Sequence, residues 1–318
     1  MSTLYLDRKG LGCKLENGAL VFYENGERCG TVPTAPLERI VFKSDVSINT
    51  GALAKLAARG IGMLFLSGHA IKPTLFLPTE HKDAERRRSQ YQLSEDPEFC
   101  RLFAVDLLTE KLQAQKRHVV DLSMENHDEK AFLESSITRL DELLGRLNAE
   151  PSLDALRGLE GLAAAVYFEA LGRCVSPELG FTHRNRRPPR DPVNALLSLT
   201  YTLLTSEAGV SAHQAGLDPF VGFLHSLEYG RPSLACDLME PLRPEADRFV
   251  LSLFQTKTIT LSDFTKTTER CLLSKDGRIK FYPQYEAVAG EWRRYLNKRS
   301  LKHASTFVTQ HRSHKQSQ

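Results

Sequence analysis

The chain has 318 residues, of which 41% are hydrophobic and 25% charged, so it can bury a large core and is not a disordered protein. The formal net charge is +3, but residues 293–318 hold seven Lys and Arg and no acid, which leaves 3 − 7 = −4 for the remainder. This balance excludes a uniformly basic protein, so any contact with nucleic acid has to come from local clusters of charge.

The first 80 residues carry β-strand signals. Asn17-Gly18 and Asn25-Gly26 separate three short β-rich runs, and Asn-Gly between such runs is a strong hairpin signal. Residues 50–58 have the pattern of one short helix that Gly60 ends. Further strand signals lie at residues 39–43, 61–66 and 74–77. Residues 1–80 are therefore predicted to form a small β-sandwich-like domain with one helix.

Beyond residue 80, apolar residues recur at helical spacing among many charges. We expect residues 81–95 to be a linker or the start of the first long helix, and residues 96–300 to form a larger helical domain that carries the functional site. A short polar hairpin is expected near residues 274–278. Residues 301–318 are basic and poor in apolar side chains, which predicts a disordered tail. The predicted fold class is α+β, with the β domain followed by an all-α domain.

The sequence also argues against export and membrane insertion. It has no run of about 18 uncharged apolar residues, and its N-terminus lacks the basic and apolar segments of a signal peptide. The six cysteines are scattered without a CxxC pair, which argues against a disulfide framework and a thiolate zinc site. We therefore expect a cytoplasmic protein with no membrane contact.

Glu160 lies in a helical stretch, residues 157–171, that is apolar on nearly all sides and therefore predicted to be buried. An ionised carboxylate there needs a cation, strong donors or a proton. Gly158 and Gly161 flank it, and since each glycine costs roughly 1 kcal/mol in a helix, they suggest that something approaches the backbone closely. The alternative is a glutamate that is favoured at a helix start by the macrodipole.

One imidazole and two carboxylates follow in a largely apolar segment further along the chain. A lone histidine such as His225 is more often a hydrogen-bonded core residue than a ligand. Asp237 and Glu240 are three residues apart, so on a helix they project from one face. A carboxylate pair can equally be a solvated surface, and Pro241 should kink or end the helix at the carboxylate.

Together, two or three carboxylates and one imidazole form a donor set that suits Mg²⁺ or Mn²⁺ better than zinc or copper. An ion of this kind can polarise a phosphoryl oxygen and activate an attacking hydroxyl. The sequence has no HExxH, P-loop or GxSxG motif that would favour another chemistry. The donor set therefore indicates a metal-dependent enzyme that acts on phosphodiesters.

Basic residues gather in a proline-rich loop at residues 182–192, in a second cluster at residues 82–88 and in the C-terminal tail. Such clusters fit contacts to a nucleic-acid backbone, although each by itself is more often a solvated surface. Two more arginines lie beside the candidate acids. The candidate DNA contacts are Arg86, Arg87, Arg184, Arg186, Arg187, Arg190, Arg231 and Arg243.

Four segments, in this order, resemble the family of CRISPR-associated endonucleases and integrases that acquire spacers. They are GLEGLAAAVYF at 158–168, RNRRPPRDPVNALLS at 184–198, DPFVGFLH at 218–225 and DLMEPLRP at 237–244. The ordered set is highly specific and covers about the middle quarter of the chain. The family's layout, a small β domain before a larger helical domain, agrees with the predicted fold.

The resemblance implies that Glu160, His225 and Glu240 are metal ligands and that Asp237 is a supporting acid in the catalytic set. It also implies a homodimer that assembles with the second, small CRISPR-associated protein and acts on double-stranded DNA. The expected reaction inserts a short DNA fragment into a CRISPR array, through attack of the fragment's 3′-hydroxyl on a phosphodiester at a repeat. The alternatives are a repair or recombination nuclease for branched DNA and a non-catalytic DNA-binding scaffold.

Overall fold

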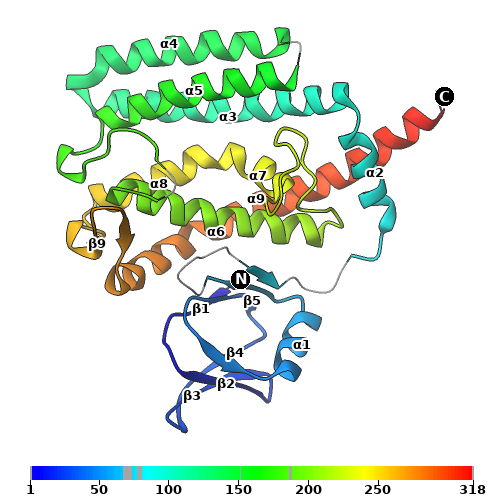
Figure 1. Ribbon diagram of the computed structural model, residues 1–318, viewed down its shortest axis with the longest axis vertical. Coiled ribbons are helices and arrows are strands. Elements are labelled where there is room, and N and C mark those ends of the chain that lie inside the picture. Colours follow the sequence, from blue (N-terminus) through cyan, green and yellow to red (C-terminus); the bar gives the residue numbers. More distant parts are fainter. Residues whose placement is uncertain (1, 67–73, 77–80, 151, 186–187, 317–318) are drawn as a thin grey trace.

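The computed structural model describes residues 2–66, 74–76, 81–150, 152–185 and 188–316. A small strand-rich domain at the N-terminus packs below a larger helical part (Figure 1). The predicted α+β class is confirmed, with one addition: a two-stranded hairpin lies within the helical part.

In its described residues, the N-terminal domain forms two four-stranded sheets, in the orders β4-β3-β2-β6 and β1-β5-β7-β8. Asn17, Gly18, Asn25 and Gly26 all have positive φ, as the predicted two-residue hairpin turns require. The strands are β1 (Ser2–Leu6), β2 (Leu11–Glu16), β3 (Ala19–Glu24), β4 (Glu27–Pro33), β5 (Leu37–Phe42), β6 (Val46–Ile48), β7 (Gly62–Phe65) and β8 (Thr74–Phe76).

The sheet that contains β5 and β7 is covered on both faces. Ile40 and Met63 belong to the core between the two sheets, whereas Val41 and Leu64 belong to the core of the helical part. Successive residues of a strand point to opposite faces, so this sheet joins the two domains. The helix α1 (Thr50–Ala58) lies where the sequence predicts it.

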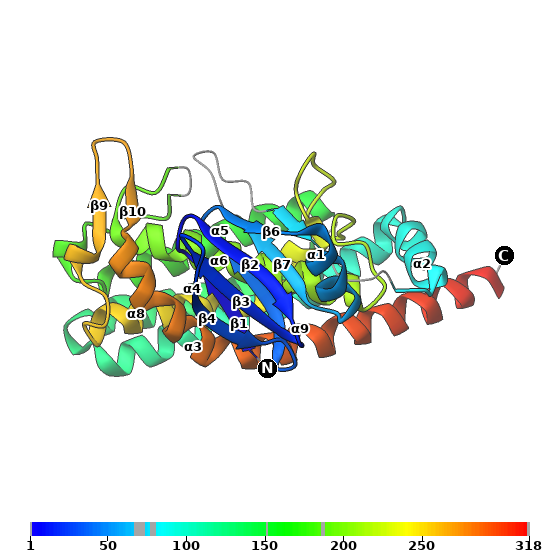
Figure 2. The ribbon, with the colours of Figure 1, turned by 90° about the horizontal axis from the view of Figure 1, so that it is seen from below.

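The helical part forms two layers. The helices α3, α4 and α5 pack together, and α6 to α9 lie between them and the β domain (Figures 1 and 2). The helices are α2 (Ala84–Ser94), α3 (Pro97–Glu125), α4 (Lys130–Arg146), α5 (Leu153–Arg173), α6 (Pro192–Gln214), α7 (Ser233–Met239), α8 (Arg243–Gln255) and α9 (Lys275–Gln316). Short 3₁₀ turns lie at His127–Glu129, Leu147–Ala149, Pro177–Leu179, Glu240–Leu242 and Leu261–Asp263. Within the described ranges, none of the helices could span a membrane.

Three expectations about the helical part are wrong. Residues 81–95 hold the separate helix α2, because Asp83 and Asp96 each cap a helix start with their side chains. The hairpin is formed by β9 (Phe264–Lys266) and β10 (Cys271–Leu273), while residues 275–278 begin α9.

The C-terminal segment is not a disordered tail as far as residue 316, because α9 continues through it. Its few apolar side chains recur at helical spacing and dock against α2 and α3. Ala304 and Phe307 are fully buried, and the Phe307 ring contacts Phe99, Phe103 and Phe223. A narrow apolar stripe is therefore enough to hold this basic helix in place.

Candidate active site

A cavity of about 380 Å³ brings together side chains from α3, α5, α6, α8 and the loops before α6 and α7. Its lining contains an excess of cationic groups beside three carboxylates and one imidazole. The charged and titratable lining residues are Lys111, Arg157, Arg184, Arg231, Arg243, Glu160, Glu240, Asp247 and His225. The three predicted metal ligands therefore share one cavity.

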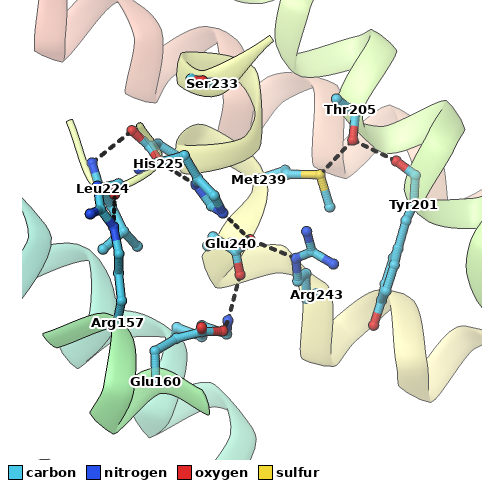
Figure 3. A network of polar contacts seen from close by, with 12 residues as sticks. Arg157, Glu160, Tyr201, Thr205, Leu224, His225, Ser233, Met239, Glu240 and Arg243 are labelled. Carbon is cyan, nitrogen blue, oxygen red and sulfur yellow. Dashed lines mark hydrogen bonds and ion pairs between the residues drawn. The ribbon is translucent and has the colours of Figure 1, made fainter. Parts of the chain in front are cut away.

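Glu240 occupies a break between two helices. The helix α7 ends at Met239, a 3₁₀ turn spans Glu240–Leu242, and α8 begins at Arg243. The prediction that Pro241 would interrupt the helix at the carboxylate is confirmed, because proline cannot donate the backbone hydrogen bond that continues a helix. The break leaves the Glu240 carboxylate buried but facing the cavity (Figure 3).

Two cations hold the Glu240 carboxylate. The Nε atom of Arg243 donates to Oε1 at 2.8 Å, and the Nζ atom of Lys111 lies 2.6 Å from Oε2. Burial by itself would raise the pKa of Glu240, but the charges of Arg243 and Lys111 outweigh it and hold that pKa well below its usual range. Glu240 is therefore ionised at neutral pH.

Asp237 is fully buried and organises the loop that carries His225. Its Oδ2 accepts the backbone N–H groups of Phe223 at 2.7 Å and Leu224 at 3.1 Å, and its Oδ1 accepts that of His225 at 3.1 Å. Oδ1 also lies 2.6 Å from His225 Nδ1. The imidazole is thereby turned so that Nε2 lies 3.9 Å from Glu240 Oε1. Asp237 positions His225 and has no free oxygen that faces the cavity.

Gly222 leaves the space that this loop needs, so we expect Gly222→Ala to displace the loop. A Cβ atom there would lie 2.7 Å from Asp237 Oδ2 and 2.8 Å from the carbonyl carbon of Ser233. The substitution should lower the free energy of unfolding by about 1–3 kcal/mol, measured by urea denaturation. As the control, a Cβ atom at Gly158 meets nothing within 4 Å among the described residues, so Gly158→Ala should stabilise by roughly 0.5–1 kcal/mol. Unchanged stability of Gly222→Ala would contradict the crowding.

Glu160 lies on α5 at the edge of the cavity, and its side chain is 32% exposed. Its Oε1 accepts from Lys111 Nζ at 2.5 Å. Glu160 is therefore only partly buried, and the cation that its ionised carboxylate was expected to need is the Lys111 ammonium. Gly158 and Gly161 are exposed, and among the described residues nothing approaches within 4 Å of the places where their Cβ atoms would lie. The close neighbour expected at these glycines is not supplied by the described part of this chain.

Sequence reasoning missed Lys111 and Arg157. Lys111 lies on α3 among the buried positions Leu107, Leu108 and Leu112, and this placement of a lysine on an apolar face was the available signal. The Nε atom of Arg157 donates to the carbonyl oxygen of Leu224 at 2.9 Å and so helps to hold the His225 loop. No local pattern marks that contact, because the two residues are 67 positions apart.

The donor types fit Mg²⁺ or Mn²⁺, but the side chains are not yet arranged around an ion. Among the residues that the structure describes, no three His, Cys, Asp or Glu side chains gather as a ready metal site. The Lys111 ammonium lies between Glu160 and Glu240 instead, where it marks a place that holds a cation. These two carboxylates, with the His225 imidazole of the same cavity, are a suitable donor set for a hard divalent ion.

The candidate DNA contacts differ in where the structure places them. Arg184, Arg231 and Arg243 line the cavity, and Arg190 is exposed on the loop before α6. Arg86 donates to the carbonyl oxygen of Ala215 at 2.9 Å and Arg87 to that of His81 at 3.2 Å, so both are engaged within the chain. Arg186 and Arg187 lie outside the described residues.

Asp247 is a buried carboxyl at the cavity wall that the sequence analysis did not single out. The hydroxyl groups of Tyr167 and Tyr201 donate to it, the former at 2.9 Å. Burial nevertheless raises the pKa of Asp247 from 3.8 to about 6. Since the raised value favours the protonated form in the folded state, the stability contributed by Asp247 is fully present below about pH 4 and is lost as the pH rises through 6.

We therefore expect the wild type to lose about 3 kcal/mol of stability relative to Asp247→Asn between pH 4 and pH 7. Urea denaturation of both proteins across this range measures the difference. The Asn variant keeps the shape and an acceptor for the tyrosines but cannot ionise. A difference in stability that does not change with pH would show that Asp247 titrates normally.

The two-domain fold places the chain in a known structural class. It superimposes on a casposase bound to an integration product with a TM-score of 0.85 at 22% identity, covering 98% of this chain and 91% of that one. It also superimposes on a chain of a Cas6-RT-Cas1–Cas2 complex with a TM-score of 0.81 at 19% identity, covering 97% of this chain and 35% of that one. At these identities the likeness establishes the shared fold.

Sequence similarity identifies the family within that class. The family model for CRISPR associated protein Cas1 matches residues 4–287. CRISPR-associated endonuclease Cas1 1 of Thermodesulfovibrio yellowstonii is 38% identical over 289 residues, which cover 90% of this chain and 91% of that protein. The chain belongs to the Cas1 family, and the resemblance noted in its sequence is confirmed.

Proposed function

We propose that this protein is a divalent-metal-dependent DNA endonuclease and integrase that inserts short DNA fragments into a CRISPR array. The observation that carries the proposal is the convergence of Glu160, His225 and Glu240 in one cavity lined by arginines. Membership of the Cas1 family and the shared fold of a casposase bound to an integration product support it.

Mg²⁺ or Mn²⁺ held by Glu160, His225 and Glu240 would supply Lewis-acid activation of the scissile phosphodiester when bound. The two glutamates contribute charged oxygens. His225 offers Nε2 to the cavity because Asp237 engages Nδ1, and an imidazole that donates from Nδ1 keeps a lone pair on Nε2. That nitrogen can serve as a ligand or accept the proton of the attacking 3′-hydroxyl.

The arginines of the cavity are suited to hold the DNA backbone. Arg184 and Arg231 reach the cavity from two loops, and Arg243 reaches the cavity from the start of α8. Guanidinium groups bind phosphate oxygens strongly and without regard to base sequence. Arg190 would extend this contact along the DNA. Arg86 and Arg87 each use one N–H group on a backbone acceptor and would contact DNA with their remaining N–H groups.

The proposed DNA partners are an incoming double-stranded fragment and the CRISPR repeat, and the proposed protein partners are a second copy of this chain and a Cas2 protein. A solved chain with this fold belongs to a Cas6-RT-Cas1–Cas2 complex, which supports a Cas2 protein as a partner. The cytoplasm, where such DNA is found, is the proposed location.

An integration assay tests the proposal. The purified protein and its Cas2 partner are mixed with a short duplex and a plasmid that carries a CRISPR repeat. With Mg²⁺ or Mn²⁺, we expect the duplex to become joined to the plasmid at the repeat. A duplex that ends in a 3′-deoxynucleotide should give no joined product, because it lacks the attacking hydroxyl, and EDTA should abolish joining. Joining that persists in EDTA would refute metal dependence.

The same assay separates the two rival functions. A repair nuclease would cleave nicked or branched DNA at least as well as repeat DNA and would join nothing. A non-catalytic scaffold would bind the fragment but leave every strand intact, with or without metal. Either result would replace the integrase proposal.

A further inference from the structure

The ammonium group of Lys111 lies between two of the three proposed metal ligands, Glu160 and Glu240. Its Nζ lies 2.5 Å from Glu160 Oε1 and 2.6 Å from Glu240 Oε2, so one cation joins two of the three proposed ligands. The Lys111 side chain is only 5% exposed. Lysine is rarely so fully buried unless it is paired, and both recorded partners of Lys111 are carboxylates of the cavity.

The four side chains that pair directly here, Lys111, Arg243, Glu160 and Glu240, have balanced charges without a metal ion. Glu160 and Glu240 carry two negative charges, and Lys111 and Arg243 carry two positive ones. A divalent ion added to the same carboxylates would leave an excess of two positive charges and would lie beside the ammonium. Like charges in a partly desolvated site repel strongly. Lys111 and a divalent ion are therefore competitors for Glu160 and Glu240.

The cavity that Lys111 lines, of about 380 Å³, has room for the displaced ammonium. Lysine is a compact charge on a flexible four-carbon stem, so it can swing away from the carboxylates without moving α3. A DNA phosphate that enters the cavity would give the displaced ammonium a new partner and would offset the excess positive charge.

We propose that Lys111 is a positioning residue that fills the cation place in the metal-free protein and is displaced when a divalent ion binds. Because a phosphate accepts the displaced ammonium, binding of the ion and binding of DNA favour each other. The inference depends on the proposed function only in taking Glu160 and Glu240 as ligands.

Binding of Mn²⁺ to Lys111→Met, measured without DNA by electron paramagnetic resonance of the free ion, tests the competition. Methionine keeps an unbranched side chain, one atom shorter than that of lysine, and removes its charge. We expect Mn²⁺ to bind at least about tenfold more tightly than to the wild type. Lys116→Met is the matched control, because Lys116 lies on the same helix in an exposed pair with Asp141 and should leave the affinity unchanged. If Lys111 only supported the fold, its loss would weaken binding.

A measurement on the wild type guards against misfolding of the variant. Reductive methylation followed by mass spectrometry reports how accessible each lysine is. We expect Lys111 to react slowly in the metal-free protein and faster with Mn²⁺, whereas Lys116 reacts equally in both.

A short duplex should raise the Mn²⁺ affinity of the wild type and raise that of Lys111→Met by less.

The outcomes also separate this inference from the proposed function. If the wild type binds Mn²⁺ but Lys111→Met binds no more tightly and Lys111 reactivity does not respond to the ion, the competition is wrong and the metal site stands. If neither protein binds Mn²⁺ and both join DNA in EDTA, the metal site itself is wrong and the competition falls with it.

Discussion

Glu160→Gln is expected to lower the rate of strand transfer roughly 100- to 1000-fold while the protein remains folded. The amide keeps the shape of the side chain but removes the charge that a divalent ion requires. Glu160 is the best position for this test because it is partly exposed, and Lys111 retains Glu240 as a partner when Glu160 is neutral. The measurement is the integration assay with Mg²⁺ or Mn²⁺.

The matched control is Glu169→Gln. Glu169 lies on the same helix but is exposed and pairs loosely with Arg139 at 3.9 Å, so its loss should leave strand transfer unchanged. Glu240→Ala should abolish transfer as well. It should also cost about 3–5 kcal/mol of stability, because it leaves the Arg243 guanidinium without its carboxylate and the buried Lys111 ammonium with Glu160 alone. Wild-type activity of Glu160→Gln would mean that the ligand set is wrong.

Asp237→Ala is expected to lower the free energy of unfolding by about 3–5 kcal/mol and to abolish strand transfer. The carboxylate accepts three consecutive backbone N–H groups, from Phe223, Leu224 and His225, and it also engages the imidazole. Its removal leaves buried donors without an acceptor and frees the ring of His225. Urea denaturation and the integration assay measure the two effects.

Asp141→Ala is the control for Asp237→Ala. Asp141 lies in an exposed pair with Lys116, so we expect its loss to change stability by no more than about 0.5 kcal/mol. Asp237→Asn further separates the two roles of Asp237, which are to hold the loop and to orient His225. Its amide keeps one acceptor oxygen but places an N–H donor against the backbone N–H groups. If Asp237→Ala were as stable as the wild type, the loop would be held by other contacts and His225 would owe its orientation to them.

Local signals in the sequence predicted much of the architecture. Asn17-Gly18 and Asn25-Gly26 adopt the positive φ values that hairpin turns need, and Pro241 ends α7 at the carboxylate as expected. These features depend on the steric properties of one or two residues, so neighbouring positions are enough to predict them. Glu160, His225 and Glu240 were predicted as ligands because their residue types and order match the motifs of the family.

Other features depend on contacts between distant segments, and only the tertiary structure decided them. Lys111 pairs with a carboxylate 49 positions away, and this pair follows from the packing of α3 against α5. The basic C-terminal segment is held as a helix because Phe307 packs against an aromatic cluster from α3 and the loop before α7. Composition reports which groups a chain carries, but burial and charge pairing are set by what the fold places beside them.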